Sequence, residues 1–181
     1  MTTPPRDPLN GRSVAGLVAI VTGAASGMGR ATARLLASQG ASVAVLDRDA
    51  EGAIEVAEEC RSLADAAQAE AWPLDVSELP FVTSVVAEVV ARFGGVDILV
   101  NNAGISVATT IDGDGFVDAW DRTIAVNLTG YALMARTCVP HLRKSNSPRI
   151  VNVASTEGPG ATAYLSPYTA AKHGGIGLTR A

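Results

Sequence analysis

Two side chains near the C-terminal end of the sequence could exchange a proton with a substrate. Tyr168 precedes Lys172 by four residues, and on a helix this spacing places both side chains on one face, about 5–6 Å apart at Cβ. A free phenol is a poor base at neutral pH, but an adjacent lysine cation favours the phenolate and lowers its pKa. The pair therefore indicates a general acid–base couple of the kind that hydride transfer between an alcohol and a nicotinamide requires. The alternative is a surface helix with an exposed lysine and a half-buried tyrosine.

A glycine-rich segment could bind phosphate groups. Residues 22–30 read Thr-Gly-Ala-Ala-Ser-Gly-Met-Gly-Arg and join a predicted strand to a predicted helix. Free backbone N–H groups and the positive dipole end of a helix attract anions, and glycines let a pyrophosphate approach the backbone closely. The alternative is a tight strand-to-helix turn that binds nothing. The candidate phosphate-binding residues are Gly23, Ser26, Gly27, Met28 and Gly29.

Two aspartates follow predicted strands and could contact the adenosine part of a dinucleotide. Asp47 ends the second strand, and a carboxylate there accepts hydrogen bonds from ribose hydroxyls and repels a 2′-phosphate, which favours NAD over NADP. Arg48 works against this preference, because an arginine nearby can accommodate a 2′-phosphate. Asp47 could instead cap a helix or lie in a solvated turn. Asp75, with the adjoining Val76, could read an adenine edge, or it could cap the next helix.

The elements that must position these groups repeat along the chain. Apolar runs rich in β-branched residues alternate with longer helical patterns, and the runs lack alternating polarity, as do strands buried on both faces of a parallel sheet. Repeated βα units with right-handed crossovers predict an α/β fold with a doubly wound parallel sheet of the Rossmann type. We expect strands at residues 17–21, 42–46, 70–74, 96–100 and 149–153, and helices at residues 27–38, 50–67, 79–93, 116–143 and from 167 onward. Pro73 predicts an edge strand or a strand end, and Pro140 should kink or end the fourth helix.

The composition limits the classes of protein that the chain can form. Its 181 residues suit one domain with a sizeable core. We expect a flexible tail at residues 1–15, which are polar and rich in proline, and a dinucleotide-binding domain at residues 16–181. The net charge of −4 gives no electrostatic footprint for nucleic acid, and no apolar run approaches the ~20 residues of a membrane span. Cys60 and Cys138 have no metal-type spacing, so we expect reduced thiols, a cytoplasmic protein and no metal.

Taken together, these motifs resemble the short-chain dehydrogenase/reductase family from about Gly16 to the last residue. The spacing Gly-x-x-x-Gly-x-Gly at residues 23–29 is similar to that of the short, single-domain branch of the family. Residues 101–104 resemble its Asn-Asn-Ala-Gly signature, which implies that Asn102, Ala103 and Gly104 line the adenosine side. The positions that match its catalytic residues are Asn127, Ser155, Tyr168 and Lys172.

The resemblance implies a role for each of these residues. Tyr168, as phenolate, takes the proton of the alcohol, while Lys172 lowers the pKa of Tyr168 and holds the nicotinamide ribose, so both also contact the cofactor. Ser155 orients the substrate oxygen, and Asn127 holds a water in a proton relay. Without the resemblance, Asn127 would be interpreted as a buried amide and Ser155 as a turn residue. Glu157 is an acid–base group by type, but nothing in the sequence places it in the site.

The sequence thus predicts an oxidoreductase that transfers a hydride between NAD(H) and a secondary alcohol or ketone. A non-catalytic dinucleotide-binding regulator or interaction module is one alternative. A sugar-nucleotide dehydratase or epimerase is another, although it would favour a different glycine spacing. Family members normally continue with further strands and a substrate-covering loop, so the fold is expected to be truncated after the helix that follows the fifth strand, which leaves an unpaired apolar edge. The resemblance also implies a homo-oligomer.

Overall fold

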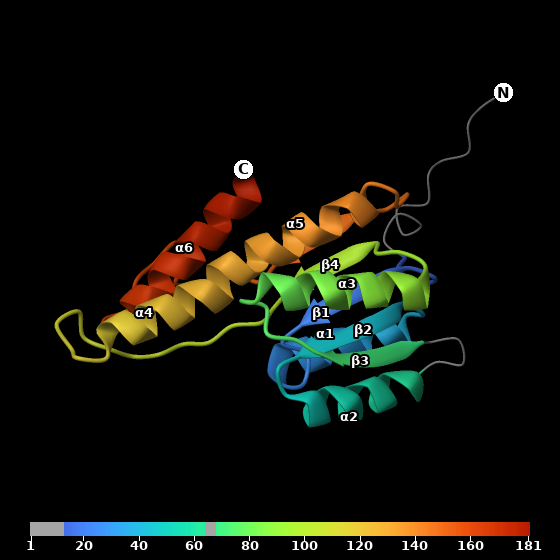
Figure 1. Ribbon diagram of the computed structural model, residues 1–181, viewed down its shortest axis with the longest axis horizontal. Coiled ribbons are helices and arrows are strands. Elements are labelled where there is room, and N and C mark those ends of the chain that lie inside the picture. The colour runs from blue at the N-terminus through green and yellow to red at the C-terminus, as the bar shows by residue number, and fades with distance from the viewer. Residues whose placement is uncertain (1–12, 64–67) are drawn as a thin grey trace.

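Five parallel strands form one sheet in the computed structural model, which describes residues 13–63 and 68–181. The strands are β1 (Val18–Thr22), β2 (Ser42–Asp47), β3 (Ala69–Pro73), β4 (Ile98–Asn101) and β5 (Arg149–Asn152). Their spatial order is β3-β2-β1-β4-β5, so the chain crosses the sheet in one direction from β1 and then returns to the other side of β1 with β4 (Figure 1). This order confirms the predicted doubly wound sheet. It creates a switch point at the carboxyl ends of β1 and β4, where sheets of this kind bind ligands.

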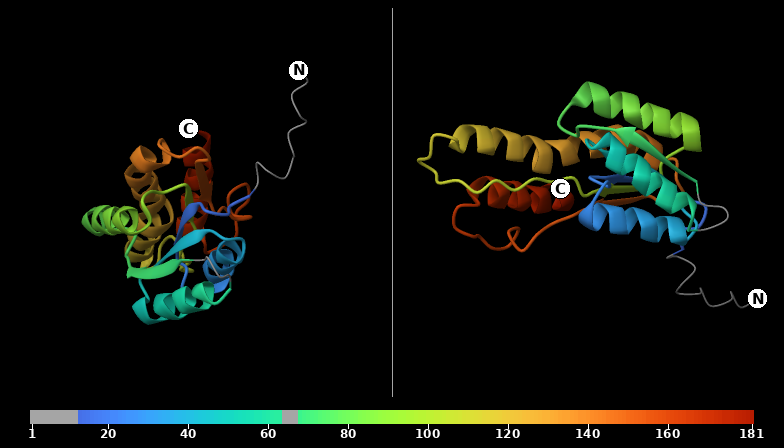
Figure 2. Two further views of the ribbon diagram at one scale, coloured as in Figure 1. Left: turned by 90° about the vertical axis from the view of Figure 1, so that its right-hand side faces the viewer. Right: turned by 90° about the horizontal axis from the view of Figure 1, so that it is seen from below.

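Helices cover both faces of the sheet. They are α1 (Gly27–Ser38), α2 (Ala50–Arg61), α3 (Leu79–Phe93), α4 (Phe116–Ile124), the π-helical turn η1 (Ala125–Thr129), α5 (Gly130–Leu142) and α6 (Ser166–Arg180). Figure 2 shows α1 and α6 on one side of the sheet and α3 and α5 on the other. Successive residues of a strand point to opposite faces. In β1, Ala19 and Val21 therefore pack in the apolar cluster under α1 and α2, while Val18 and Ile20 pack in the cluster under α3 and α5.

The helix predicted at residues 116–143 is divided into three segments. The segments α4, η1 and α5 follow one another in a continuous rod (Figure 1). A π turn replaces i→i+4 by i→i+5 hydrogen bonds, and such turns inside α-helices are frequent at functional sites. Here the turn contains the buried Asn127. Pro140 lies inside α5, which ends two residues later at Leu142.

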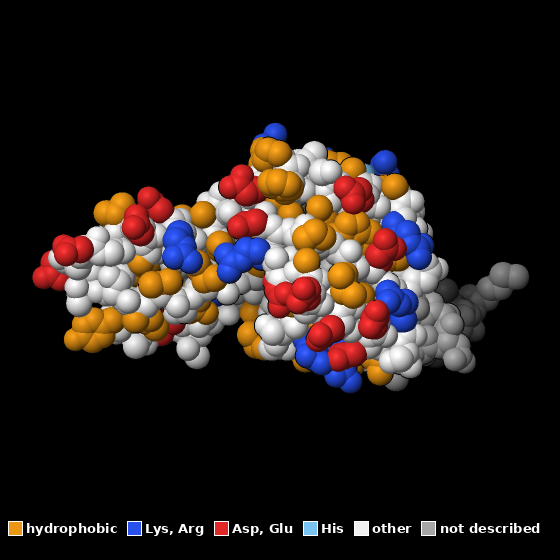
Figure 3. Space-filling model, turned by 60° about the horizontal axis from the view of Figure 1, so that its bottom comes forward, with side chains coloured by type: hydrophobic (Ala, Val, Ile, Leu, Met, Phe, Trp, Pro, Cys, Tyr) orange, Lys and Arg blue, Asp and Glu red, His pale blue; other side chains and the backbone are white. Residues whose placement is uncertain are grey.

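A lobe made of α4 and α6 projects beyond the carboxyl ends of the strands (Figures 1 and 3). Within this lobe α6 packs along α4 and η1. Gly174 allows the close approach, because a Cβ at this position would lie 2.7 Å from Leu128 Cδ2 in η1. The helix that carries the predicted tyrosine–lysine pair therefore lies against the turn that carries Asn127.

Several predicted boundaries differ from the observed ones. Pro73 is the last residue of β3, which is an edge strand as predicted. The second helix ends at Arg61, and residues 64–67 of the predicted helix lie outside the described residues. Most of the predicted tail, residues 1–12, also lies outside them. Val14 is buried in the cluster under α1 and α2, so packing of the domain begins before residue 16.

The surface carries charge of both signs and one open apolar edge. Figure 3 shows acidic and basic side chains interspersed on the face that it presents. Strand β5 pairs with β4 along one side only, and Ile150 and Val151 are 40% and 46% exposed. Among the described helices, none combines the length and the apolar character needed to cross a membrane.

Candidate functional site

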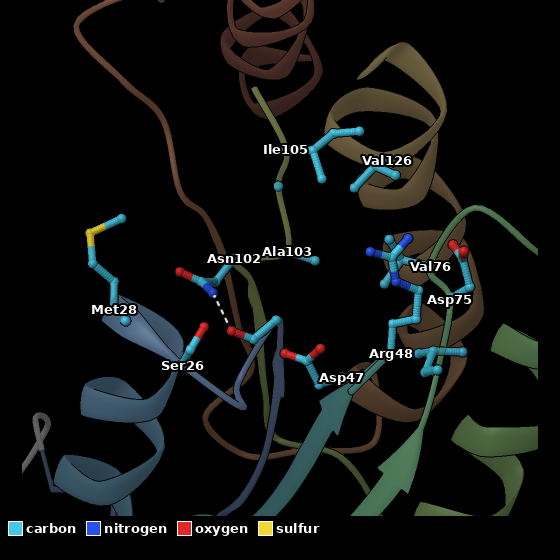
Figure 4. A pocket seen from close by; sticks show the side chains of 14 residues that line it. Ser26, Met28, Asp47, Arg48, Asp75, Val76, Asn102, Ala103, Ile105 and Val126 are labelled. Carbon is cyan, nitrogen blue, oxygen red and sulfur yellow. Dashed lines mark hydrogen bonds between the residues drawn. The ribbon is translucent and has the colours of Figure 1, made fainter. Parts of the chain in front are cut away.

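The carboxyl ends of β1 to β4 open into a cleft of about 360 Å³ (Figure 4). This volume falls in the range of small-molecule and cofactor sites, ~300–1,000 Å³. The predicted cofactor-binding residues that line it are Gly23, Ser26, Gly27, Met28, Asp47, Asp75, Val76, Asn102, Ala103 and Gly104. Arg48 also lines the cleft, and sequence reasoning missed Leu74, Ile105 and Val126, which adjoin predicted site residues and carry no chemical signal of their own.

The glycine loop, residues 22–29, is shaped by two different requirements. Gly29 is buried, and a Cβ there would overlap the Gly23 carbonyl oxygen and lie 2.5 Å from Asn102 Nδ2. Gly27 has a φ of +53° with no atom within 4 Å of its Cβ position, so its open side adjoins free space. Ser26 is the N-cap residue of α1, but its hydroxyl makes no capping hydrogen bond. A free hydroxyl and an open backbone at a helix N-terminus fit a pyrophosphate.

Asn102 ties the glycine loop to the end of β4. Its Nδ2 donates to the carbonyl oxygens of Thr22, at 2.9 Å, and Gly23, at 3.0 Å; the second bond is drawn in Figure 4. Thr22 Oγ1 in turn accepts the backbone N–H groups of Asn102, at 3.0 Å, and Ala103, at 3.1 Å. These bonds join the two strands at the switch point, so Asn102 holds the cleft wall in place.

Asp47 lines the cleft and also braces the glycine loop. Its Oδ2 accepts the backbone N–H of Ala25 at 2.9 Å, and its Oδ1 accepts that of Asp49 at 3.0 Å. The capping role considered for Asp47 belongs to Asp49, which accepts the backbone N–H of Gly52 at the start of α2. Each Asp47 oxygen retains acceptor capacity, because a carboxylate has about four acceptor sites. A ribose hydroxyl could use that capacity.

Asp75 forms a turn before α3 and does not cap the helix. Its Oδ1 accepts the backbone N–H of Ser77, at 3.0 Å, and the Ser77 hydroxyl, at 2.6 Å, whereas the N-cap residue of α3 is Glu78. The hydrogen bonds from Ser77 lower the pKa of Asp75, with a further contribution from the charge of Arg48. Figure 4 shows the Arg48 side chain reaching toward Asp75 and Val76. Asp75 is therefore ionised and lies near the cation of Arg48.

Asn127 is buried and fastens the wall of the cleft. Its Oδ1 accepts the Ile105 backbone N–H at 2.8 Å, and its Nδ2 donates to the Ile105 carbonyl oxygen at 2.7 Å. Gly104 packs beside it, because a Cβ there would lie 3.4 Å from Asn127 Oδ1. The Asn127 side chain thus satisfies backbone groups, as the buried-amide interpretation expected. The water relay that the family resemblance implies stays a prediction.

Lys172 and Tyr168 both lie on α6 and face each other. The Lys172 Nζ atom lies 5.6 Å from the centroid of the Tyr168 ring. Sequence reasoning missed Tyr131, whose ring centroid lies 5.2 Å from the same Nζ. Nζ donates to the Val153 carbonyl oxygen at 2.6 Å and to the Tyr131 hydroxyl at 3.3 Å. We refer to Lys172, its two tyrosines and the Val153 carbonyl as the lysine site.

Burial governs the ionisable groups of the lysine site. Lys172 is 4% exposed, and burial lowers the pKa of its ammonium. Tyr131 is 2% exposed; burial raises the pKa of its phenol, and the charge of Tyr168 adds to this effect. Tyr131 therefore stays protonated at neutral pH and contributes no charge of its own.

The serine loop, residues 153–165, is fastened to α6 through Glu157. Ser155 Oγ accepts the backbone N–H of Glu157 at 3.2 Å. The Glu157 carboxylate accepts from the Thr162 backbone N–H, at 2.9 Å, and from the hydroxyls of Thr162 and Thr169, each at 2.6 Å. These hydrogen bonds, from Thr162 and then Thr169, lower the pKa of Glu157. Because Thr169 follows Tyr168 directly, Glu157 links the segment of Ser155 to the helix of Tyr168.

The predicted catalytic residues lie beyond the lining of the cleft. That lining reaches Ile105, which Asn127 holds, and Val126, which precedes Asn127. His173 is exposed, and its Nδ1 lies 3.0 Å from the Thr169 carbonyl oxygen. In the part of the chain that the structure describes, no three His, Cys, Asp or Glu side chains gather as a metal site would require.

A doubly wound sheet with a phosphate-type glycine loop at its switch point defines a dinucleotide-binding class of α/β protein. The profile of the family described as short chain dehydrogenase matches residues 17–181, and the chain belongs to this family. The predicted resemblance is therefore confirmed.

Two curated relatives and one solved structure that resemble this chain are dehydrogenases. The cis-4-hydroxycyclohexanecarboxylate dehydrogenase of Sinomonas cyclohexanicum is 44% identical over 94% of this chain and 67% of its own length. The D-beta-hydroxybutyrate dehydrogenase of Rhizobium meliloti is 40% identical over 90% of this chain and 62% of its own. The crystal structure of an NAD⁺-bound xylitol dehydrogenase superposes with a TM-score of 0.86 at 32% identity, covering 92% of this chain and 63% of that one. The chain thus spans about two thirds of the length of these relatives.

Proposed function

We propose that the chain carries the cofactor cleft and the acid–base residues of an oxidoreductase that interconverts a secondary alcohol and a ketone with NAD(H). One observation carries the proposal: a buried lysine lies against the ring of Tyr168 on the same helix, with its Nζ 5.6 Å from the ring centroid. A cation at this distance favours the phenolate form of the tyrosine. The relatives named above are dehydrogenases of hydroxyl compounds, and their names support the reaction class.

The cleft fits a dinucleotide in its charges and in its open backbone. Ser26 and Gly27 would hold the pyrophosphate, Asp47 the adenosine ribose and Lys172 the nicotinamide ribose. The carboxylate of Asp47 favours NAD over NADP, and the NAD⁺-bound state of the related xylitol dehydrogenase supports the same preference. When bound, the nicotinamide supplies the hydride acceptor for oxidation and the hydride donor for reduction.

The side chains of the site handle the proton and the orientation of the substrate. In oxidation the Tyr168 phenolate takes the proton of the alcohol, and in reduction the phenol returns it. Lys172 stabilises the phenolate by its charge. Ser155 donates a hydrogen bond to the substrate oxygen and orients it. Asn127 fixes the wall at Ile105, so that the substrate and the cofactor meet beside Tyr168.

The substrate class follows from the proton step. A small molecule with a secondary hydroxyl or a ketone offers the oxygen that Tyr168 requires. We further propose that the protein is cytoplasmic, as its composition and cysteines suggested, and that it forms a homo-oligomer, as the family resemblance implies. A dinucleotide-binding module without turnover is the alternative, since the proposed catalytic residues lie beyond the lining of the cleft.

Tyr168→Phe tests the proposal. The variant keeps the ring and loses the proton carrier, so NADH affinity, followed by fluorescence titration, should stay unchanged. Turnover of a panel of secondary alcohols, followed by NADH absorbance, should fall by about 10²–10⁴-fold. Tyr164→Phe is the matched control, because Tyr164 is 65% exposed and lies four residues earlier. Near-normal turnover by Tyr168→Phe contradicts the proposal, and NADH binding without turnover in the unaltered chain favours the binding module.

A further inference from the structure

Lys172 is a buried cation that contacts no carboxylate among residues 13–63 and 68–181. Its side chain is 4% exposed, and among the described residues its only hydrogen-bond acceptors are the Val153 carbonyl and the Tyr131 hydroxyl. The ion pairs Arg30–Glu59, Arg34–Glu59 and Arg92–Glu70 all involve arginines. Burying an unpaired charge is costly unless polar groups compensate it. The structure must therefore hold this ammonium by neutral groups alone.

Tyr131 supplies much of that compensation from a separate helix. Its hydroxyl oxygen accepts from Lys172 Nζ at 3.3 Å, while its own proton points to the Val153 carbonyl oxygen, also at 3.3 Å. Its ring faces the same Nζ with a centroid distance of 5.2 Å, which adds a cation–π attraction. The backbone of Tyr131 is itself held, because its carbonyl oxygen accepts from Asn101 Nδ2 at 3.3 Å. Both rings of the lysine site thus contact one ammonium.

We propose that Tyr131 is a positioning residue, which fixes the Lys172 ammonium against Tyr168 and keeps it charged. The inference rests on the proposed function, since it assigns a partner to the proposed catalytic pair. A carboxylate in place of Tyr131 would neutralise the field of the lysine, and Tyr168 would then lose the charge that favours its phenolate. A phenol accepts the hydrogen bond and adds no charge, so the field of the cation reaches Tyr168 undiminished.

Lysine titration in the Tyr131→Phe variant tests the proposal directly. The chain has two lysines, Lys144 and Lys172, so NMR of ¹³Cε-labelled lysine gives two resonances, and Lys144→Arg identifies them. Hydrogen bonds to charged groups are strong enough to shift a pKa by about one unit. We therefore expect the Lys172 titration to move down by about one pH unit in Tyr131→Phe. Tyr164→Phe, a change at an exposed tyrosine, should leave it in place.

A second measurement uses the unaltered sequence, in case Tyr131→Phe fails to fold. The chain has three tyrosines, at positions 131, 164 and 168, and 3-fluorotyrosine reports on each by ¹⁹F NMR. The resonances of Tyr131 and Tyr168 should both move through the titration of Lys172, and that of Tyr164 should not. A Tyr131 resonance that ignores Lys172, or an unchanged Lys172 titration in a folded Tyr131→Phe variant, overturns the proposal.

Kinetics separate this inference from the proposed function. If Tyr131 keeps the lysine charged, Tyr131→Phe weakens the positive charge beside Tyr168, so the acid limb of the pH–kcat profile for alcohol oxidation moves up by about one unit, with about tenfold less turnover on that limb. KM should change little, because Tyr131 touches no substrate. A shifted lysine titration in a chain without turnover would support Tyr131 and refute the oxidoreductase. The opposite result is turnover that depends on Tyr168, combined with a Lys172 titration and a pH–kcat profile that Tyr131→Phe does not shift. It would support the oxidoreductase and refute the role of Tyr131.

Discussion

The cofactor cleft keeps its polar groups open to solvent, whereas the lysine site buries them and bonds them to one another. In the cleft, the Ser26 hydroxyl caps nothing and Asp47 retains acceptor capacity. In the lysine site, Lys172 and Tyr131 are almost fully buried, and both bond to the Val153 carbonyl. The first region keeps polar groups available for a ligand, whereas in the second the buried groups already bond to one another.

This difference indicates how each region would respond to mutation. The cleft depends on backbone shape, so a single added methyl group should disturb it. The lysine site depends on the balance of one charge among neutral groups, so its changes should appear as shifts in pH dependence. Glu157 connects the segment of Ser155 to the helix of Tyr168 through the Thr169 hydroxyl, and it belongs to neither the cleft nor the lysine site.

Gly29→Ala should have the largest effect on the cleft side of the comparison. The new Cβ would overlap the Gly23 carbonyl oxygen and lie 2.5 Å from Asn102 Nδ2, so the glycine loop must move. Overpacking of this kind costs about 1–3 kcal/mol. If 2–3 kcal/mol of it falls on the bound state, NADH affinity drops by roughly 100-fold, as measured by fluorescence titration.

Gly177→Ala is the matched control for that substitution. Gly177 is exposed on α6, with no atom within 4 Å of its Cβ position. Removing a glycine from a helix interior stabilises it by roughly 0.5–1 kcal/mol, so this variant should unfold at a slightly higher temperature and bind NADH normally. Unchanged NADH affinity in Gly29→Ala would show that the loop does not shape a cofactor site.

The cleft was more predictable from the sequence than the lysine site. Glycine spacing, the polar residue at a strand end and the Asn-Asn-Ala-Gly run are local signals, because a phosphate loop and a strand end are each built from adjacent residues. Ten of the predicted cofactor residues line the cleft for this reason. Gly29 is the predicted loop residue that does not line the cleft. It is buried beside Asn102, which lies more than seventy residues away in the sequence, so local spacing could not reveal this contact.

The lysine site was predictable from the sequence only in part. The i, i+4 spacing of Tyr168 and Lys172 is local and was readable. Tyr131 reaches the same ammonium from α5, and no sequence pattern links positions 131 and 172. Glu157 was set aside for the same reason, since its partner Thr169 lies on α6. The π turn at Asn127 was also missed, because such turns are rare and occur as single turns inside longer α-helices.

Asp47→Asn should have a smaller effect, confined to cofactor choice. The amide oxygen can still accept the Ala25 N–H, but the charge that repels a 2′-phosphate is lost. We expect the ratio of NADH to NADPH affinity to fall about tenfold, which corresponds to ~1.4 kcal/mol. Asp49→Asn, two residues along, replaces the N-cap of α2 by an equally good cap and should change neither affinity. A ratio that stays constant in Asp47→Asn would assign cofactor choice to another residue, with Arg48 the nearest candidate.

Lys172→Met should have the smallest effect, which should appear in the pH dependence of thermal stability. This variant tests how much the buried charge of Lys172 destabilises the fold. Burial lowers the pKa of Lys172 in the folded chain relative to its ordinary value near ~10.4 in the unfolded chain. At a pH below the pKa that Lys172 has in the folded chain, the lysine is protonated in the folded and the unfolded chain, so the folded chain carries the full cost of the buried charge. As the pH rises from that pKa to the pKa in the unfolded chain, the unfolded chain binds more protons than the folded chain, and the cost disappears. At neutral pH the Lys172→Met variant should therefore unfold at a higher temperature than the wild type. The increase should be a few degrees at most, since 1 kcal/mol shifts the unfolding midpoint by ~2–4 °C in a chain of this size.

The difference in unfolding temperature between the wild type and Lys172→Met should disappear as the pH approaches ~10.4. Thermal unfolding followed by circular dichroism across this window measures it, and Lys144→Met serves as control because Lys144 is exposed. The difference between the two chains cancels the titration of every group that Lys172 does not contact, so the closing of the gap reports on the lysine site. A gap that does not vary with pH would mean that Tyr131, the ring of Tyr168 and the Val153 carbonyl compensate the ammonium fully, and the lysine site would then store no electrostatic cost at all.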